Sequence, residues 1–157
     1  EISFLKGRGA CKTEKKLILI GGSPTHGAYE EQVRDIVDER IIFPGYIYGN
    51  DTNVLMKNAY AYIQPSIIEG LSPVILTVMG LGTPLICSDI PENKFITGEN
   101  ATHFNSGNTE SLSEKIEYSL SNIDKMKIKA ETGQKDILKR FNWDIITEKY
   151  IELFSSR

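Results

Sequence analysis

The sequence is poor in several residue types and patterns that mark particular classes of protein. Its 157 residues include only two cysteines, two histidines and one tryptophan. Cys11 and Cys87 follow no metal-binding or redox spacing, and two such thiols fit a reducing compartment. No apolar run approaches the roughly 20 residues that cross a membrane as a helix. These absences argue against a disulfide-stabilised secreted domain, a Cys/His metal module and a membrane-spanning helix.

A surface of one charge is lacking as well. Lysine and arginine number 18 against 21 acidic residues, and the two signs are mixed along the chain. Without a basic stripe, we expect no nucleic-acid partner. His26 and His103 stand beside no nucleophile or ligand partner in the sequence, so surface or loop roles are favoured over catalysis. The length and the 40% hydrophobic content fit one globular domain with a sizeable core.

Short apolar runs alternate with amphipathic stretches. The runs predict strands at Leu17–Ile20, Ile41–Phe43, Ala61–Ile63, Leu85–Cys87 and around Phe104. Helical spacing predicts helices within Tyr29–Arg40, behind a cap at Asn50 or Asp51, over Val74–Met79, behind a cap at Asn108, around Ile137 and Leu138, and from Trp143 to Leu153. Trp143 and Cys87 are expected in the core. The alternation predicts an α/β fold, a doubly wound and mostly parallel sheet with helices on both faces.

The loop from Pro65 to Pro73 carries the most chemical information. It joins a predicted buried strand to a helix, and in parallel sheets ligands bind where such loops leave the strands. Gly70 lets the backbone approach a ligand closely. The free N–H groups around the helix start suit a phosphate or a sugar hydroxyl, and Glu69 can accept hydrogen bonds from hydroxyls. The loop alone fits equally well a plain strand-to-helix turn with an exposed glutamate.

The segment Pro65–Asp89 resembles the signature of family 4 (group 1) retaining glycosyltransferases. The pattern P-S-x-x-E-G, an apolar helix, G-x-P, a strand and S-D all occur here in order. The resemblance extends to the Gly-Gly-x-Pro turn ending at Pro24, to Ile41–Tyr46, to Asp89–Asn93 and to the closing Phe141-Asn142-Trp143. It implies the carboxy-terminal, donor-binding domain of a two-domain GT-B fold. The whole chain, 1–157, is then one nucleotide-sugar-binding domain, a fragment lacking its first strand and the amino-terminal acceptor domain.

The resemblance also implies roles for individual residues. Glu69 would act as the catalytic-site residue that holds hydroxyls of the transferred sugar. The substrate-binding residues would be Gly45, Tyr46 and Ile47 along the base, Gly70, Leu71 and Ser72 at the sugar or diphosphate, and Thr77 at the ribose. No cofactor and no metal are expected, because a helix start stabilises the leaving diphosphate. The implied partners are a nucleotide sugar, the missing amino-terminal domain and a glycan or lipid-linked acceptor. The implied location is cytoplasmic, or peripheral at the inner face of a membrane.

Two departures from the family pattern bear on activity. Thr77 stands where the family has a second glutamate that grips the ribose, and Phe95 stands where variants of Asp89–Asn93 often carry another. The family's diphosphate-clamping arginine and lysine lie after its first strand, and neither Arg8 nor Lys12 has a matching context. We therefore expect a retaining hexosyltransferase whose isolated chain is inactive. The alternatives are a degenerate GT-B module that binds or scaffolds without catalysis and, less favoured, a sugar-nucleotide epimerase.

Overall fold

The computed structural model describes residues 13–22, 31, 35 and 38–155. Most of the helix predicted within Tyr29–Arg40, most of the loop Gly21–Gly27, and His26 lie outside these residues. The strands are β1 (Leu17–Ile20), β2 (Ile41–Gly45), β3 (Tyr62–Gln64), β4 (Leu85–Ser88) and β5 (Thr102–Phe104). The helices are α3 (Asn50–Asn58), α4 (Pro73–Gly80), α5 (Pro91–Thr97), α6 (Thr109–Ser121), α7 (Ile123–Arg140), α8 (Trp143–Ser155) and the short 3₁₀ helix η1 (Gly98–Asn100).

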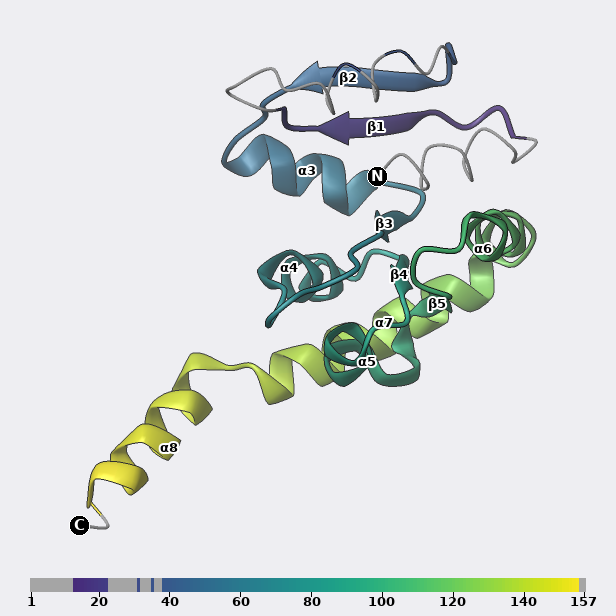
Figure 1. The fold of residues 1–157 in the computed structure, drawn as a ribbon. Coiled ribbons are helices and arrows are strands. Elements are labelled where there is room, and N and C mark those ends of the chain that lie inside the picture. Colours follow the sequence, from purple (N-terminus) through teal and green to yellow (C-terminus); the bar gives the residue numbers. More distant parts are fainter. Residues whose placement is uncertain (1–12, 23–30, 32–34, 36–37, 156–157) are drawn as a thin grey trace.

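All the described strand pairs are parallel. β1 pairs with β2, and β3, β4 and β5 pair in that order, with β4 in the centre. β1 and β3 are not hydrogen-bonded to each other, so the strands form two groups (Figure 1). Parallel strands joined by helices are the predicted α/β architecture.

β4 explains how one core forms on each face of the sheet. All four of its residues are buried, and successive side chains of a strand point to opposite faces. Ile86 belongs to the cluster that holds Leu112 and Ile116 of α6. Leu85 and Cys87 belong to the opposite cluster, with residues of α4, α5 and α7. A strand covered by helices on both sides confirms the doubly wound arrangement.

The first core also joins the two strand groups. Its buried members include Ile41 of β2 beside Ile86 and Phe104 of the three-stranded sheet. Partly buried Leu17, Leu19 and Ile63 pack against it. The β1–β2 pair is therefore attached to the rest of the domain through side-chain packing and not through the sheet hydrogen-bond ladder.

Several local predictions are confirmed and others are wrong. Asn108 caps α6 as expected, because its side chain accepts from the Ser111 amide at 2.8 Å. Gly49, with φ 65°, holds the N-cap of α3 in place of Asn50 or Asp51, and no side chain caps that helix. β2 runs to Gly45, two residues beyond the predicted strand Ile41–Phe43.

Trp143 is the clearest wrong prediction. Its side chain is 79% exposed, and α8 buries none of its residues. Figure 1 shows α8 extending away from the sheet, so its apolar stripe has nothing to pack against in the described part of the chain. On α7, by contrast, Met126, Ala130, Gly133 and Ile137 are buried, while Leu138 is 60% exposed.

Candidate functional site

The Glu69 side chain is held in place by its own loop. Its Oε1 accepts a hydrogen bond from Ser66 Oγ at 2.6 Å and another from Gln64 Nε2 at 2.9 Å. Gln64 is the last residue of β3, and its Nε2 also lies 2.7 Å from Ser66 Oγ. Glu69 itself is half-buried. The carboxylate thus stands at the end of a parallel strand in a fixed orientation, which excludes the unattached surface glutamate that the sequence left open.

The start of α4 follows directly. Ser72 is the N-cap residue with an extended backbone, and its side chain is buried at 2% exposure without capping the helix. Pro73 at the first position has no N–H to offer, so the free donors of the first turn are the amides of Val74 and Ile75. Together with the Gly70 and Leu71 amides they present positive partial charge where the loop meets the helix.

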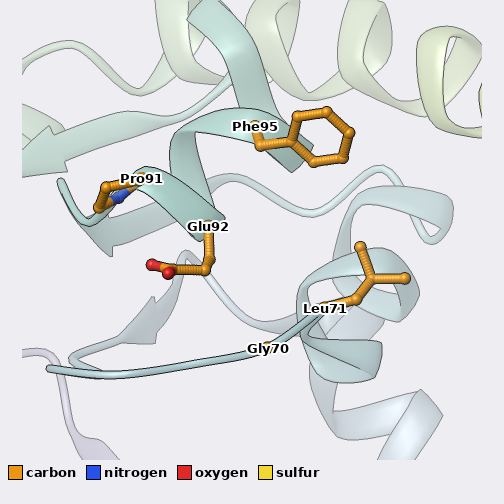
Figure 2. A pocket seen from close by; sticks show the side chains of 5 residues that line it. All are labelled: Gly70, Leu71, Pro91, Glu92 and Phe95. Atoms are coloured by element: carbon orange, nitrogen blue, oxygen red, sulfur yellow. The ribbon is translucent and has the colours of Figure 1, made fainter.

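An open groove lies beside this loop. It is lined by Gly70, Leu71, Pro91, Glu92 and Phe95, with a volume of about 370 Å³. Figure 2 shows Leu71 and Phe95 on one side of the groove and the Glu92 carboxylate on the other. Leu71 and Phe95 are 52% and 66% exposed, so the wall they form is apolar and accessible.

The sequence patterns predicted no helix at α5, which forms one wall of the groove. The available signal was Pro91 at the first helical position with Glu92 in the first turn. Phe95 was noted only as a departure from a family pattern. The structure places it on the same groove as Gly70 and Leu71.

Polar residues behind the groove connect α5 to the loop. Asn93 is fully buried, and its Nδ2 donates to Ser88 O at 3.1 Å and lies 3.0 Å from Ser88 Oγ. Ser88 Oγ in turn donates to the backbone carbonyl of Ser66. Asn93 Oδ1 is the one buried side-chain oxygen or nitrogen without a partner among the described residues.

Asp89 braces the loops at this edge of the sheet and does not cap the helix that follows β4. Its Oδ1 accepts from the Ser106 amide at 2.9 Å, and its Oδ2 lies 3.4 Å from Lys94 Nζ. The Ser106 hydrogen bond is the main cause that holds the pKa of the Asp89 carboxyl below its usual value, with Lys94 adding to it. Asp89 is therefore a structural carboxylate that links β4 to the segment after β5.

Gly45, Tyr46 and Ile47 stand at the end of β2, in the other strand group. Gly45 has φ 80°, and Tyr46 donates its hydroxyl to Gly22 O at 2.7 Å. The Tyr46 and Tyr48 rings stack with centroids 5.8 Å apart, and both are at least half exposed. No hydrogen bond within the described part of the chain joins these residues to the Glu69 loop.

Thr77 lies one turn inside α4 and is exposed. Its hydroxyl donates to the Pro73 carbonyl at 2.9 Å, which is a local bond within the helix. The side chain keeps lone pairs for accepting a hydrogen bond but has given its proton to the backbone. It therefore offers one acceptor where a glutamate would offer two oxygens.

Two half-buried groups near the site, Tyr62 and His103, have shifted pKa values. Burial is the main cause that raises the pKa of Tyr62, with Glu69 adding to it, and the main cause that lowers the pKa of His103. His103 Nε2 lies 2.9 Å from Thr97 Oγ1.

Among the described residues no group of three His, Cys, Asp or Glu side chains is placed to hold a metal ion. None of the described helices is long and apolar enough to cross a membrane.

Sequence comparison gives the family to which this chain belongs. The family described as "Glycosyl transferases group 1" matches residues 5–122. The chain belongs to this family, and its fold is that of the carboxy-terminal half of a GT-B enzyme.

Two curated relatives illustrate the similarity. An uncharacterised glycosyltransferase of Methanocaldococcus jannaschii is 23% identical over 142 residues, which cover 88% of this chain and 36% of that protein. The O-antigen chain mannosyltransferase RfbU of Salmonella typhimurium is 30% identical over 91 residues, covering 57% of this chain and 26% of that protein. The chain thus spans about a third or less of the length of these relatives.

Solved structures share the fold over nearly the whole chain. Sucrose-phosphate synthase from Thermosynechococcus elongatus superposes with a TM-score of 0.85 at 22% identity, covering 99% of this chain and 43% of its own. Anabaena HepE, solved in complex with UDP-glucose, superposes with a TM-score of 0.85 at 19% identity, covering 99% and 44%. At these identities the likeness describes the fold alone.

Proposed function

We propose that this chain is the donor-binding half of a retaining hexosyltransferase, which moves a sugar from a nucleoside-diphosphate sugar to an acceptor. The observation that carries the proposal is the Glu69 carboxylate, fixed by Gln64 and Ser66 directly before the start of α4. A carboxylate that accepts from hydroxyls and a helix start that attracts a diphosphate are the two recognition elements that such a donor requires. Here only Gly70, Leu71 and Ser72 separate them.

The proposed roles follow the order of the groups along the loop. Glu69 holds sugar hydroxyls, and the amides of Gly70, Leu71 and Ser72 contact the sugar or the diphosphate. Positive partial charge at the α4 start stabilises the diphosphate as it leaves, so the proposed mechanism uses no metal and no cofactor. The leaving phosphate helps to deprotonate the acceptor on the same face, which retains the anomeric configuration.

The nucleoside is assigned to residues further from Glu69. In this proposal Gly45, Tyr46 and Ile47 lie along the base, and Thr77 accepts one ribose hydroxyl. The exposed rings of Tyr46 and Tyr48 offer a flat apolar surface at this end. Anabaena HepE was solved with UDP-glucose and with UDP, which makes uridine nucleotides the first probes to use.

Thr77 supports a second candidate, a degenerate module that binds or scaffolds without catalysis. Replacing a charged acceptor by a hydroxyl weakens a hydrogen bond by about 1.5–3 kcal/mol, and this hydroxyl already donates to Pro73. Membership of the transferase family disfavours the epimerase alternative. The choice between an active and a degenerate domain depends on whether the sugar part of a donor is bound.

We propose that the remainder of the protein supplies the acceptor domain and a further strand. β1 and β3 are unpaired with each other, and a narrow cavity lined in part by Leu17, Ile63 and Ile86 lies between them. A parallel strand there would join the two groups into one sheet. Without it and the acceptor domain, the isolated chain would be inactive. A glycan or lipid-linked acceptor at the inner face of a membrane, in the cytoplasm, remains the proposed setting.

Ligand-observed NMR tests the function. Saturation transfer to UDP, GDP, ADP and their sugar conjugates detects millimolar binding, with Glu69→Ala as the variant. We expect signal for one nucleotide, and a weaker sugar signal in Glu69→Ala while the nucleotide signal persists. Equal sugar signals in the two proteins would contradict the role of Glu69. Absence of binding by the full-length protein would contradict the donor site as a whole.

A further inference from the structure

Three side chains at the end of β3 form a closed triangle of hydrogen bonds. Gln64 Nε2 lies 2.7 Å from Ser66 Oγ and 2.9 Å from Glu69 Oε1, and Ser66 Oγ lies 2.6 Å from the same Oε1. The Gln64 amide nitrogen donates toward both oxygens, and the Ser66 hydroxyl donates to Glu69 Oε1.

The opposite orientation of the Gln64 amide is chemically unfavourable. It would place the amide oxygen against the carboxylate and against a hydroxyl that can serve only one of the two. The carboxylate therefore selects the amide orientation of Gln64 and the hydroxyl rotamer of Ser66 together. A triangle that fixes all three side chains at once is a rigid unit and not a set of independent surface contacts.

The triangle is anchored from the protein interior. Gln64 ends β3 at the position paired with Cys87 of β4, which is fully buried. The backbone carbonyl of Ser66 accepts from Ser88 Oγ, and Ser88 is contacted by the buried Asn93 of α5. Loop motion that moved Glu69 would therefore break bonds to β4 as well as within the loop.

We propose that Gln64 and Ser66 are positioning residues that fill Oε1 of Glu69 and leave Oε2 as its single acceptor for the donor sugar. Oε2 accepts no hydrogen bond from the part of the chain that the structure describes. A carboxylate with both oxygens free can accept from hydroxyls on either side, whereas this one presents only Oε2. The site then accepts sugar hydroxyls from the Oε2 side alone. The part of this inference that concerns a donor sugar rests on the proposed function, whereas the triangle of hydrogen bonds does not.

The triangle is tested first without ligand. The side-chain amide signals of Gln64 in a ¹⁵N correlation spectrum of the full-length protein report its hydrogen bonds. We expect Glu69→Ala and Ser66→Ala to move them, and Glu92→Ala, which removes a carboxylate from the same groove, to leave them in place. If neither Glu69→Ala nor Ser66→Ala moves the Gln64 side-chain signals, the triangle of hydrogen bonds is overturned, whether or not the protein binds sugar nucleotides.

The consequence for sugar recognition is tested by affinity. Calorimetry with UDP and UDP-glucose, or GDP and GDP-mannose if guanine is bound, gives the ratio of the two dissociation constants. We expect Gln64→Leu and Ser66→Ala to weaken the binding of the nucleotide sugar about three- to tenfold relative to the nucleotide alone, whose affinity should not change. The reason is a partial loss of charge-assisted hydrogen bonding to the sugar. Gln134→Leu is the matched control, because it removes a 2.7 Å bond to Gly80 O away from Glu69.

The outcomes separate the two proposals. A parallel loss of nucleotide and sugar affinity in Gln64→Leu would indicate a merely structural role and overturn the positioning role. A sugar contribution lost in Glu69→Ala but kept in Gln64→Leu and Ser66→Ala would overturn positioning while leaving the proposed function intact. A sugar contribution unaffected by Glu69→Ala would instead refute the proposed function, even with the ligand-free triangle confirmed.

Discussion

Arg140, at the end of α7, holds Phe95 of α5 through both its backbone and its ring. The guanidinium Nη2 donates to Phe95 O at 2.8 Å, and the guanidinium carbon lies 5.7 Å from the centre of the Phe95 ring. Nη1 donates to Ile96 O at 3.1 Å and is paired with Asp136 at 2.8 Å. Carbonyls near the end of a helix lack intrahelical partners, and a cation there satisfies them. The wall of the groove is thus fixed by a residue 45 positions further along the chain.

Arg140→Ala is expected to destabilise the domain by about 1–3 kcal/mol, because it leaves the two carbonyls of α5 without their donors. The measurement is the free energy of unfolding from urea denaturation. Lys139→Ala is the control, since Lys139 is exposed and its neighbour carries the contacts. Equal, small effects of the two substitutions would contradict a bracing role for Arg140.

Cys87 is expected to resist alkylation in the folded protein. It is fully buried between the helices that cover one face of β4, and burial is the main cause that raises its pKa to about 12 from 9.0. At pH 8 its thiolate fraction is then about a thousandfold below that of an exposed cysteine, before access is considered. Iodoacetamide labelling followed by mass spectrometry of the Cys87 peptide measures this.

The same peptide labelled in concentrated guanidinium chloride supplies the reference rate for Cys87. Native labelling at that rate would show that β4 is open to solvent. Such a result would also remove the anchor proposed for the Glu69 triangle, because Gln64 is paired with Cys87 in the sheet.

Asp89 is expected to make stability depend on pH in the acid range. Its pKa is lowered in the folded protein, chiefly by the Ser106 amide, so the unfolded chain binds its proton more readily than the folded one. Its contribution is fully present above the unfolded pKa of about 3.9 and is lost as pH falls through the folded value. Asp89→Asn should therefore be less stable than the unaltered protein at pH 7, with the difference shrinking toward pH 3.

Urea denaturation at several pH values measures that difference. Asp124→Asn provides a comparison at another carboxylate, in the first turn of α7. A constant gap between Asp89→Asn and the unaltered protein across the range would mean that the carboxylate charge contributes nothing.

The sequence predicted those helices and strands that have a local sequence pattern of their own. The strand Leu85–Cys87 and the helix behind the Asn108 cap are local patterns, and both were predicted correctly. α5 was missed because its seven residues lack a side-chain cap and bury only Asn93, Ile96 and Thr97. A short helix that buries two polar residues has no apolar period to detect.

The site shows the same division. Glu69 and Gly70 were identified from their place between a strand and a helix. Gln64 and Ser66 were not, although they stand five and three positions before Glu69, because only the loop conformation brings their donors to one oxygen. The association of Phe95 with the groove depends on the packing of α5 against α4 and on Arg140, which no local pattern contains.

Trp143 gives a direct optical test of how α8 is placed. It is the only tryptophan in the sequence and is 79% exposed, so the emission of the folded 157-residue chain should resemble that of the unfolded chain. Iodide should quench both to a similar extent. A blue-shifted, protected emission would mean that α8 folds back onto the domain.

In a longer chain with the proposed acceptor domain, we expect the blue shift to appear, because Tyr150, Phe154 and Trp143 leave an exposed apolar surface on α8. Asp144, Glu148 and Glu152 outnumber Lys149 on this helix, so an anionic membrane surface is the less favourable cover, and vesicles of anionic lipid should leave the emission unchanged.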